Sequence, residues 1–186
     1  MASSDIDILV PLVHCFVILD SDGNRQVAKY YDGKDAAAQS AFEQMLQKKT
    51  RTVPAKQDVE VMLLDNELVV FRSGQDCKMF VTGGVDENEL ILVSVLDAIF
   101  ETVAALLRGQ VESTLLMEHL ELVLLTIDET LDHGHIMELD ASSVMSRVLM
   151  RSSDAQGQGL GDLSLSQALG MASAQFMKSI ATGEGV

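Results

Sequence analysis

The chain has 186 residues and a formal net charge of −15, from 13 basic and 28 acidic side chains. This length allows one domain with an appendage, and 47% hydrophobic residues suffice for a buried core without disulfides. Because phosphate contacts need a basic surface, so acidic a chain is a poor candidate for binding nucleic acid. It is equally unlikely to hold an anionic membrane by charge alone.

Targeting, membrane and redox signals are weak. Residues 1–7 carry two acids and no lysine or arginine, unlike a secretory signal. The most apolar stretch, residues 90–107, is interrupted by two acidic side chains and makes a poor transmembrane helix. Cys15 and Cys77 are too few for a disulfide framework, and both lie in apolar strand-like runs. We therefore expect buried, reduced thiols.

A β-hairpin is predicted at the start of the chain. Residues 12–20 are apolar on both faces, which is typical of a central strand, and residues 26–31 form the returning strand. Between them, the Asp22-Gly23 step tolerates the positive φ angles of tight turns. Asp20 and Asp22 imitate the start of a calcium loop, but the acidic residue at its twelfth position is missing. A hairpin turn is the better interpretation.

Residues 36–51 predict a helix with one apolar stripe, which we assign to Ala38, Phe42, Met45 and Lys49, with Ala41 and Leu46 beside it. Such a helix covers one face of a sheet.

Three further strands follow over residues 59–64, 68–72 and 77–82, with short turns between them. Short turns between consecutive strands indicate an antiparallel meander. Together with the hairpin and the helices, these elements predict an α+β fold: a five-stranded antiparallel sheet sandwiched by helices.

The second half of the chain is helical. Residues 90–107 follow a pattern resembling a capping box, Asp86 with Glu89, and are apolar nearly all round. Such a helix needs cover on two sides, one from the sheet and the other from a neighbouring helix or another protein. Residues 112–131 predict a second, acidic helical region in which we allow for a bend, and residues 142–150 predict a short helix.

The predicted domain spans residues 12–150, after a flexible N-terminus of residues 1–11. Residues 151–162 are rich in Ser, Gly and Gln, as in a linker, and residues 163–180 form an amphipathic helix before a disordered tail of residues 181–186. The apolar stripe of this terminal helix is Leu165, Leu169, Ala172, Phe176 and Ile180. It either docks on its own domain or lies in the groove of a partner.

No catalytic constellation is visible. Residues 133–135 offer two imidazoles, but nothing completes a tetrahedral metal site. His14 and Cys15 are adjacent on a strand and point to opposite faces, so they cannot act as base and nucleophile. Asp128 and Glu129 diverge on a helix and are best interpreted as solvated acids. Without a phosphate loop or a nucleophile elbow, we expect no enzyme, no cofactor and no metal.

Five segments follow one another in a distinctive order: the hairpin of residues 18–32, residues 88–90, residues 127–129, residues 143–151 and the terminal helix. In this order they resemble the coatomer zeta-subunit family of the clathrin-adaptor small-chain superfamily. The motif positions are Asp20, Asp22, Gly23, Lys29, Tyr30, Tyr31, Asn88, Glu89, Leu90, Asp128 and Glu129. The resemblance implies a longin-like (SNARE-like) fold.

The resemblance further implies a small core subunit of the COPI vesicle coat, peripheral on the cytosolic side of Golgi membranes, in retrograde Golgi-to-ER and intra-Golgi transport. It implies direct pairing with the coatomer gamma subunit, alongside the beta and delta subunits. An Arf-family GTPase would act through the complex, and membrane contact would be indirect.

Six apolar residues are predicted to face the partner. The long helix contributes Leu92, Val95 and Ile99, for which an internal helix contact is the alternative interpretation. The terminal helix contributes the other three, Leu165, Leu169 and Phe176.

Two other functions remain open from the sequence. A sigma-type clathrin-adaptor small subunit would read dileucine sorting signals through an apolar two-lobed pocket near the sheet–helix junction, but sigma subunits usually lack a helix beyond the core. A longin-domain GTPase regulator or SNARE is the second, although a SNARE needs longer heptads than residues 165–180 provide.

The negative charge is unevenly distributed. Residues 36–57 hold four bases and one acid, a net of +3, whereas residues 84–111 hold five acids and one base, a net of −4. Residues 112–140 hold eight acids and no base, a net of −8. The helical second half is therefore expected to face solvent or a basic surface rather than an anionic membrane.

Overall fold

The computed structural model describes residues 12–53 and 58–155, with the backbone alone for residues 153–155. The chain divides into two units, residues 1–148 and residues 149–186, and the fold below is that of the first. The sequence-based domain limits at residues 11, 150, 162 and 180 stay predictions.

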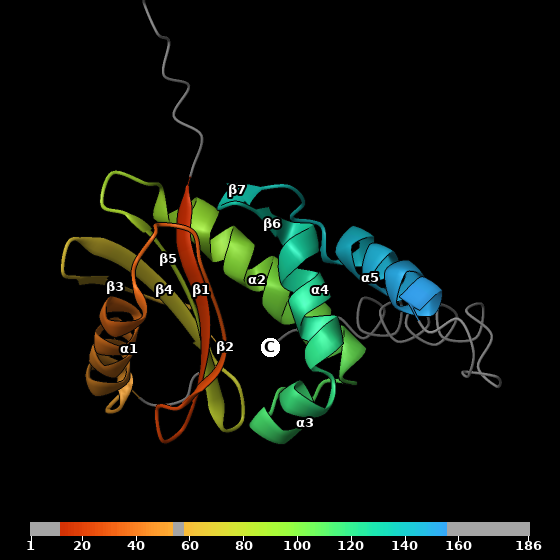
Figure 1. Cartoon of the computed structure of the whole chain (residues 1–186), viewed down its shortest axis with the longest axis horizontal. Helices are drawn as coiled ribbons and strands as arrows, with labels where there is room; N and C mark the ends of the chain where they lie inside the picture. Colours follow the sequence, from red (N-terminus) through yellow and green to blue (C-terminus); the bar gives the residue numbers. More distant parts are fainter. Residues whose placement is uncertain (1–11, 54–57, 156–186) are drawn as a thin grey trace, which may run out of the picture. The chain divides into compact units, whose positions relative to one another are not determined.

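Five strands form one antiparallel sheet with the order β2-β1-β5-β4-β3. They are β1 (Val13–Asp20), β2 (Arg25–Tyr30), β3 (Glu60–Leu64), β4 (Glu67–Ser73) and β5 (Cys77–Gly84). The helices are α1 (Ala36–Thr50), α2 (Glu89–Leu106), α3 (Ser113–Glu118), α4 (Leu120–Thr130) and α5 (Ala141–Ala155). Helix α1 lies on one side of the sheet and α2 and α4 on the other, which confirms the α+β sandwich (Figure 1).

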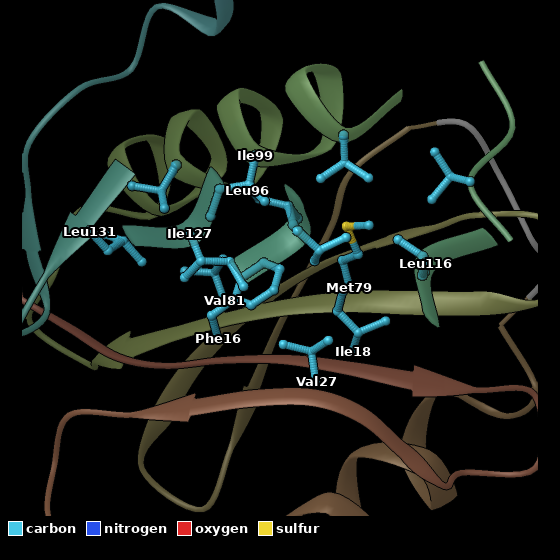
Figure 2. Packing of buried hydrophobic residues seen from close by; sticks show 14 of the residues in the cluster. Phe16, Ile18, Val27, Met79, Val81, Leu96, Ile99, Leu116, Ile127 and Leu131 are labelled. Carbon is cyan, nitrogen blue, oxygen red and sulfur yellow. The ribbon is translucent and has the colours of Figure 1, made fainter. Parts of the chain in front are cut away.

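Each face of the sheet carries its own core. Alternation along β1 sends Phe16 and Ile18 toward α2 and α4, and Val17 and Leu19 toward α1. Figure 2 shows the larger core, in which strand side chains meet Leu96 and the other apolar residues of the helices. The prediction that β1 is central and covered on both faces is confirmed.

The predicted stripe of α1 is partly wrong. Phe42 is buried as expected, but Ala38 and Lys49 are exposed and Met45 is only partly buried. The buried side runs through Phe42, Leu46 and Thr50, of which Leu46 was expected beside the stripe. Glu43 is also buried on this side, where it accepts hydrogen bonds from Arg25 and Tyr30 of β2, an interaction that apolar periodicity does not report.

The boundaries of the later helices also differ from expectation. The cap of α2 is Asn88, whose side chain accepts a hydrogen bond from the Leu90 amide at 2.9 Å, so the predicted role of Asp86 is wrong. The expected bend within residues 112–131 is a break at His119 between α3 and α4. Beyond α4, the glycine-containing stop forms a two-residue hairpin, β6 (Leu131–Asp132) with β7 (His135–Ile136). Helix α5 extends five residues past the predicted end at residue 150.

The two cysteines lie on opposite faces of the sheet, Cys15 in the α1-side core and Cys77 in the α2-side core. Both thiols are free and buried, and burial raises the pKa of each to about 12. Since the thiolate is the reactive form, we expect neither thiol to react with Ellman's reagent near neutral pH while the chain is folded. Adding denaturant should release two thiols per chain, and fast native labelling of either would contradict the structure.

Candidate protein-interaction site

Two of the motif positions meet across the fold. Lys29 on β2 forms an ion pair with Asp128 on α4, although the two residues are 99 positions apart in the sequence. The pair joins the hairpin to the helix that covers it. Asp128, expected to be a solvated acid, is half-exposed but paired.

The two adjacent motif tyrosines pack on opposite faces of the sheet. Tyr30 packs against the α1-side core, and its hydroxyl donates a hydrogen bond to Glu43 at 2.9 Å. Tyr31 packs against the α2-side core, where burial raises its pKa to about 12. Both act as packing residues that fix the end of the hairpin between two layers.

The motif carboxylate Asp20 organises the β1–β2 turn. Its Oδ1 accepts hydrogen bonds from the backbone amides of Asp22 and Asn24, and its Oδ2 accepts from the side chains of Asn24 and Gln26. Gly23 has a φ of +89°, and a side chain there would clash with Gln47. This is the predicted hairpin turn, held by an aspartate that bonds its own loop.

Because Asp20 holds the β1–β2 turn in its ionised form, the free energy of unfolding should depend on pH. Partial burial opposes ionisation, but the bonds from Asn24, Asp22 and Gly23 prevail and hold the pKa of Asp20 below its usual 3.8. The stabilisation by the ionised Asp20 is therefore complete at pH values above 3.8. It is lost as the pH falls through the lowered pKa of the folded state. Asp20→Asn should cost about 1 kcal/mol in urea unfolding near pH 6 and less near pH 3. An equal loss at both pH values would contradict this sign.

The Asn-Glu-Leu motif starts α2. Because Asn88 caps the first turn, Asn88→Ala should lower the free energy of unfolding by about 1 kcal/mol. Asn88→Asp should restore most of the loss, since aspartate also accepts from the backbone. Of the other two motif positions, Glu89 suits the positive end of the helix dipole and Leu90 is 68% exposed. Thermal unfolding of the three chains measures the effect, and equal midpoints would argue against the cap.

The side chain of Glu129 also belongs to an ion-pair network and is not exposed to solvent. It is buried, and Arg147 on α5 lies 3.7 Å from one of its carboxylate oxygens and 2.7 Å from Glu138. The prediction that Glu129 is a solvated acid is therefore wrong. The motif residues with defined contacts hold elements together, and none of them points to catalysis.

The three partner-facing candidates on α2 lie inside the domain. Leu92, Val95 and Ile99 have 0% exposure and pack in the α2-side core, where α4 and the sheet cover them. Their contact with a partner stays a prediction, and in the free chain the internal contact prevails. The other three candidates, Leu165, Leu169 and Phe176, lie outside the described residues.

A polar cluster that the sequence did not indicate lies at one end of the sheet. Ligand-type atoms of His14, Asp32 and Glu67 lie within 4.8 Å of one another. The ammonium group of Lys34 binds both carboxylates and lies 5.1 Å from the centre of the Phe42 ring. Since the Lys34 ammonium already pairs with both carboxylates, the arrangement is that of an ion-pair network joining β1, β4 and the β2–α1 loop.

A hollow of about 490 Å³ lies between the β1–β2 turn and α1. Its lining is polar and charged: Ser21, Asp22, Gly23, Gln44, Gln47, Lys48 and Arg51. It does not have the apolar character that a dileucine pocket requires.

The sequence analysis missed an exposed apolar surface on β3. Val61 and Leu63 are 48% and 67% exposed, whereas Leu64, on the other face of the same strand, is buried under α1. The available signal was that this edge strand is apolar on both faces, which an isolated domain does not need. On α2, Leu90 is the most exposed large apolar side chain of the described residues.

Within the described ranges, no helix combines the length and apolarity needed to cross a bilayer. The model of the clathrin adaptor complex small chain family matches residues 12–155. A chain of the structure described as "Homology model of the full-length AP-3 complex in a stretched open conformation" superposes with a TM-score of 0.61, covering 78% of this chain and 98% of that chain at 12% identity. The chain therefore belongs to the family of clathrin adaptor small chains, with the longin-like fold that the resemblance implied.

The sequence comparisons are more specific. Coatomer subunit zeta-2 of Arabidopsis thaliana is 41% identical over 92% of this chain and 97% of its own length. Coatomer subunit zeta-1 of Homo sapiens is 37% identical over 90% of this chain and 92% of its own length. Within the small chains, this protein belongs to the coatomer zeta subunits.

Proposed function

We propose that the chain is the small zeta-type core subunit of the COPI coat and acts by binding other subunits rather than by catalysis. The observation that carries this proposal is the match to coatomer zeta subunits over nine-tenths of the chain. The sigma-type alternative is not favoured, because the matched relatives are coatomer zeta subunits.

The direct partner in this proposal is the coatomer gamma subunit, with beta and delta in the same core. An Arf-family GTPase recruits the assembled coat to the cytosolic side of Golgi membranes, and the chain contacts the membrane only through its partners. The acidic helical half supports this arrangement, because eight acids and no base over residues 112–140 would be repelled by anionic lipid.

Affinity capture of the tagged chain, followed by mass spectrometry, tests the proposal. We expect the gamma, beta and delta coatomer subunits in the eluate. Recovery of clathrin-adaptor large chains in their place would overturn the zeta-type assignment. Co-expression with gamma should also raise the soluble yield and the melting temperature of the chain, as expected for a subunit stabilised by its partner.

A further inference from the structure

The two faces of strand β3 are covered unequally. On the α1 side, Leu64 is buried and Met62 packs against the core, so the helix covers the strand. On the other side, α2 packs on β5 and β4, and the C-terminal end of β2 forms an ion pair with α4 through Lys29. Val61 and Leu63 on that same side remain 48% and 67% exposed. One strand of an otherwise covered sheet therefore lacks its second layer.

The flank of α2 borders this uncovered strand. Arg72 on β4 pairs with Asp97 of α2 at 2.9 Å and lies 4.1 Å from the centre of the Phe100 ring. The Asp97 side of α2 thus faces β4, the neighbour of β3. Leu90 and Val93 lie on the same helical line, at three- and four-residue spacing, and Leu90 is 68% exposed. We call the exposed Val61, Leu63 and Leu90 the β3–α2 face.

The charge around the β3–α2 face is strongly acidic. Residues 58–107 hold ten acids and two bases. Two of these acids are already paired, Asp97 with Arg72 and Glu67 with Lys34, and the Lys78 ammonium donates to the carbonyl of Thr50 on α1. Exposed Asp58, Asp65 and Glu89 flank the apolar residues. A complementary occupant combines an apolar stripe with flanking lysines or arginines.

The terminal segment of this chain does not have that chemistry. Residues 156–186 contain one base and two acids, so the terminal segment offers no charge complementarity. An anionic lipid surface would be repelled by the acidic rim. A helix is the expected form because the opposite face of β3 is already completed by a helix, α1, and a sheet face is buried by one packed layer.

We propose that the β3–α2 face binds an amphipathic helix with basic flanks, contributed by the coatomer gamma subunit of the proposed function. This inference deepens the proposed function and rests on it. It assigns the contact to Val61, Leu63 and Leu90, not to the buried residues of α2.

The test uses the full chain co-expressed with the coatomer gamma subunit. The double variant Val61→Thr/Leu63→Thr removes the apolar surface and places threonine, which suits a strand, at both positions. Met137→Thr is the matched control, because Met137 is 60% exposed and lies outside the β3–α2 face. We expect the double variant to weaken binding of purified gamma at least tenfold, with the control unchanged. Binding by the wild type should also weaken with added salt.

Leu90→Gln provides a second variant from the α2 side of the face, and should weaken binding with an unchanged melting temperature. If the wild type binds gamma and both face variants bind equally well, the inference fails while the proposed function stands. If the wild type does not bind gamma, the proposed function fails and the inference with it. A wild-type homodimer that the double variant abolishes would assign the face to a second copy and overturn the proposal.

Discussion

Replacing Ile99 by alanine is expected to lower the free energy of unfolding by about 2–5 kcal/mol, the cost of a cavity in a close-packed core. Ile99 has 0% exposure and lies between the sheet and α4, with Leu96 and Ile127 beside it (Figure 2). For a domain of this size, such a loss lowers the melting temperature by several degrees. Urea unfolding followed by circular dichroism measures the free energy directly.

Leu90→Ala is the matched control on the same helix. Leu90 is 68% exposed, so its truncation should change the stability of the free chain by less than about 0.5 kcal/mol. The two substitutions therefore distinguish an effect on stability from an effect on partner binding. Ile99→Ala should destabilise the free chain, and Leu90→Ala should weaken only gamma binding. If Ile99→Ala left stability unchanged and reduced gamma capture, the partner-facing interpretation of Ile99 would be restored.

The order of strands and helices could be predicted from the sequence because it is set by local signals. Strand β1 is apolar on both faces, the hairpin turn contains the Asp22-Gly23 step, and short turns join β3, β4 and β5. These features depend on neighbouring residues alone, so each element could be located without knowing its tertiary contacts.

The faces of the helices were harder to predict because tertiary pairs decide them. Glu43 is buried by its contacts with β2, and apolar periodicity assigns a glutamate to solvent. Likewise, Lys29 pairs with Asp128 across 99 residues, a contact that no local pattern reports. The burial of Leu92, Val95 and Ile99 depends on whether α4 covers α2, which the apolar pattern of α2 alone leaves undecided.

The candidate surface was missed for a related reason. A strand that is apolar on both faces is consistent with a central strand, or with an edge strand that has one face covered by another protein. Only the sheet order, with β3 at the edge and α2 packed over β4 and β5, distinguishes the two. The exposed Val61 and Leu63 become informative once their neighbours on β4 are known to be covered.

Removing Arg25 is expected to be the second most damaging change, because it leaves a buried carboxylate short of donors. Glu43 has only 6% exposure and accepts hydrogen bonds from Arg25 at 2.7 and 3.0 Å and from Tyr30 at 2.9 Å. Arg25→Ala should lower the free energy of unfolding by about 2–3 kcal/mol, since a charge-assisted pair is lost and the acid stays buried.

The arginine itself is partly exposed, with 38% of its side chain accessible, which keeps the expected loss below that of a fully buried pair. Arg25→Lys should recover only part of the stability, because lysine lacks the planar group that binds a carboxylate through two nitrogens.

The double variant Arg25→Met/Glu43→Leu decides the cause of the loss. It removes the charge and the donor together, so it should be more stable than Arg25→Ala, with coupling of the two sites in a double-mutant cycle. Chemical unfolding of the wild type, Arg25→Met, Glu43→Leu and the double variant gives the coupling energy. If the two single losses simply added, Arg25 and Glu43 would act independently, which would contradict the pairing seen in the structure.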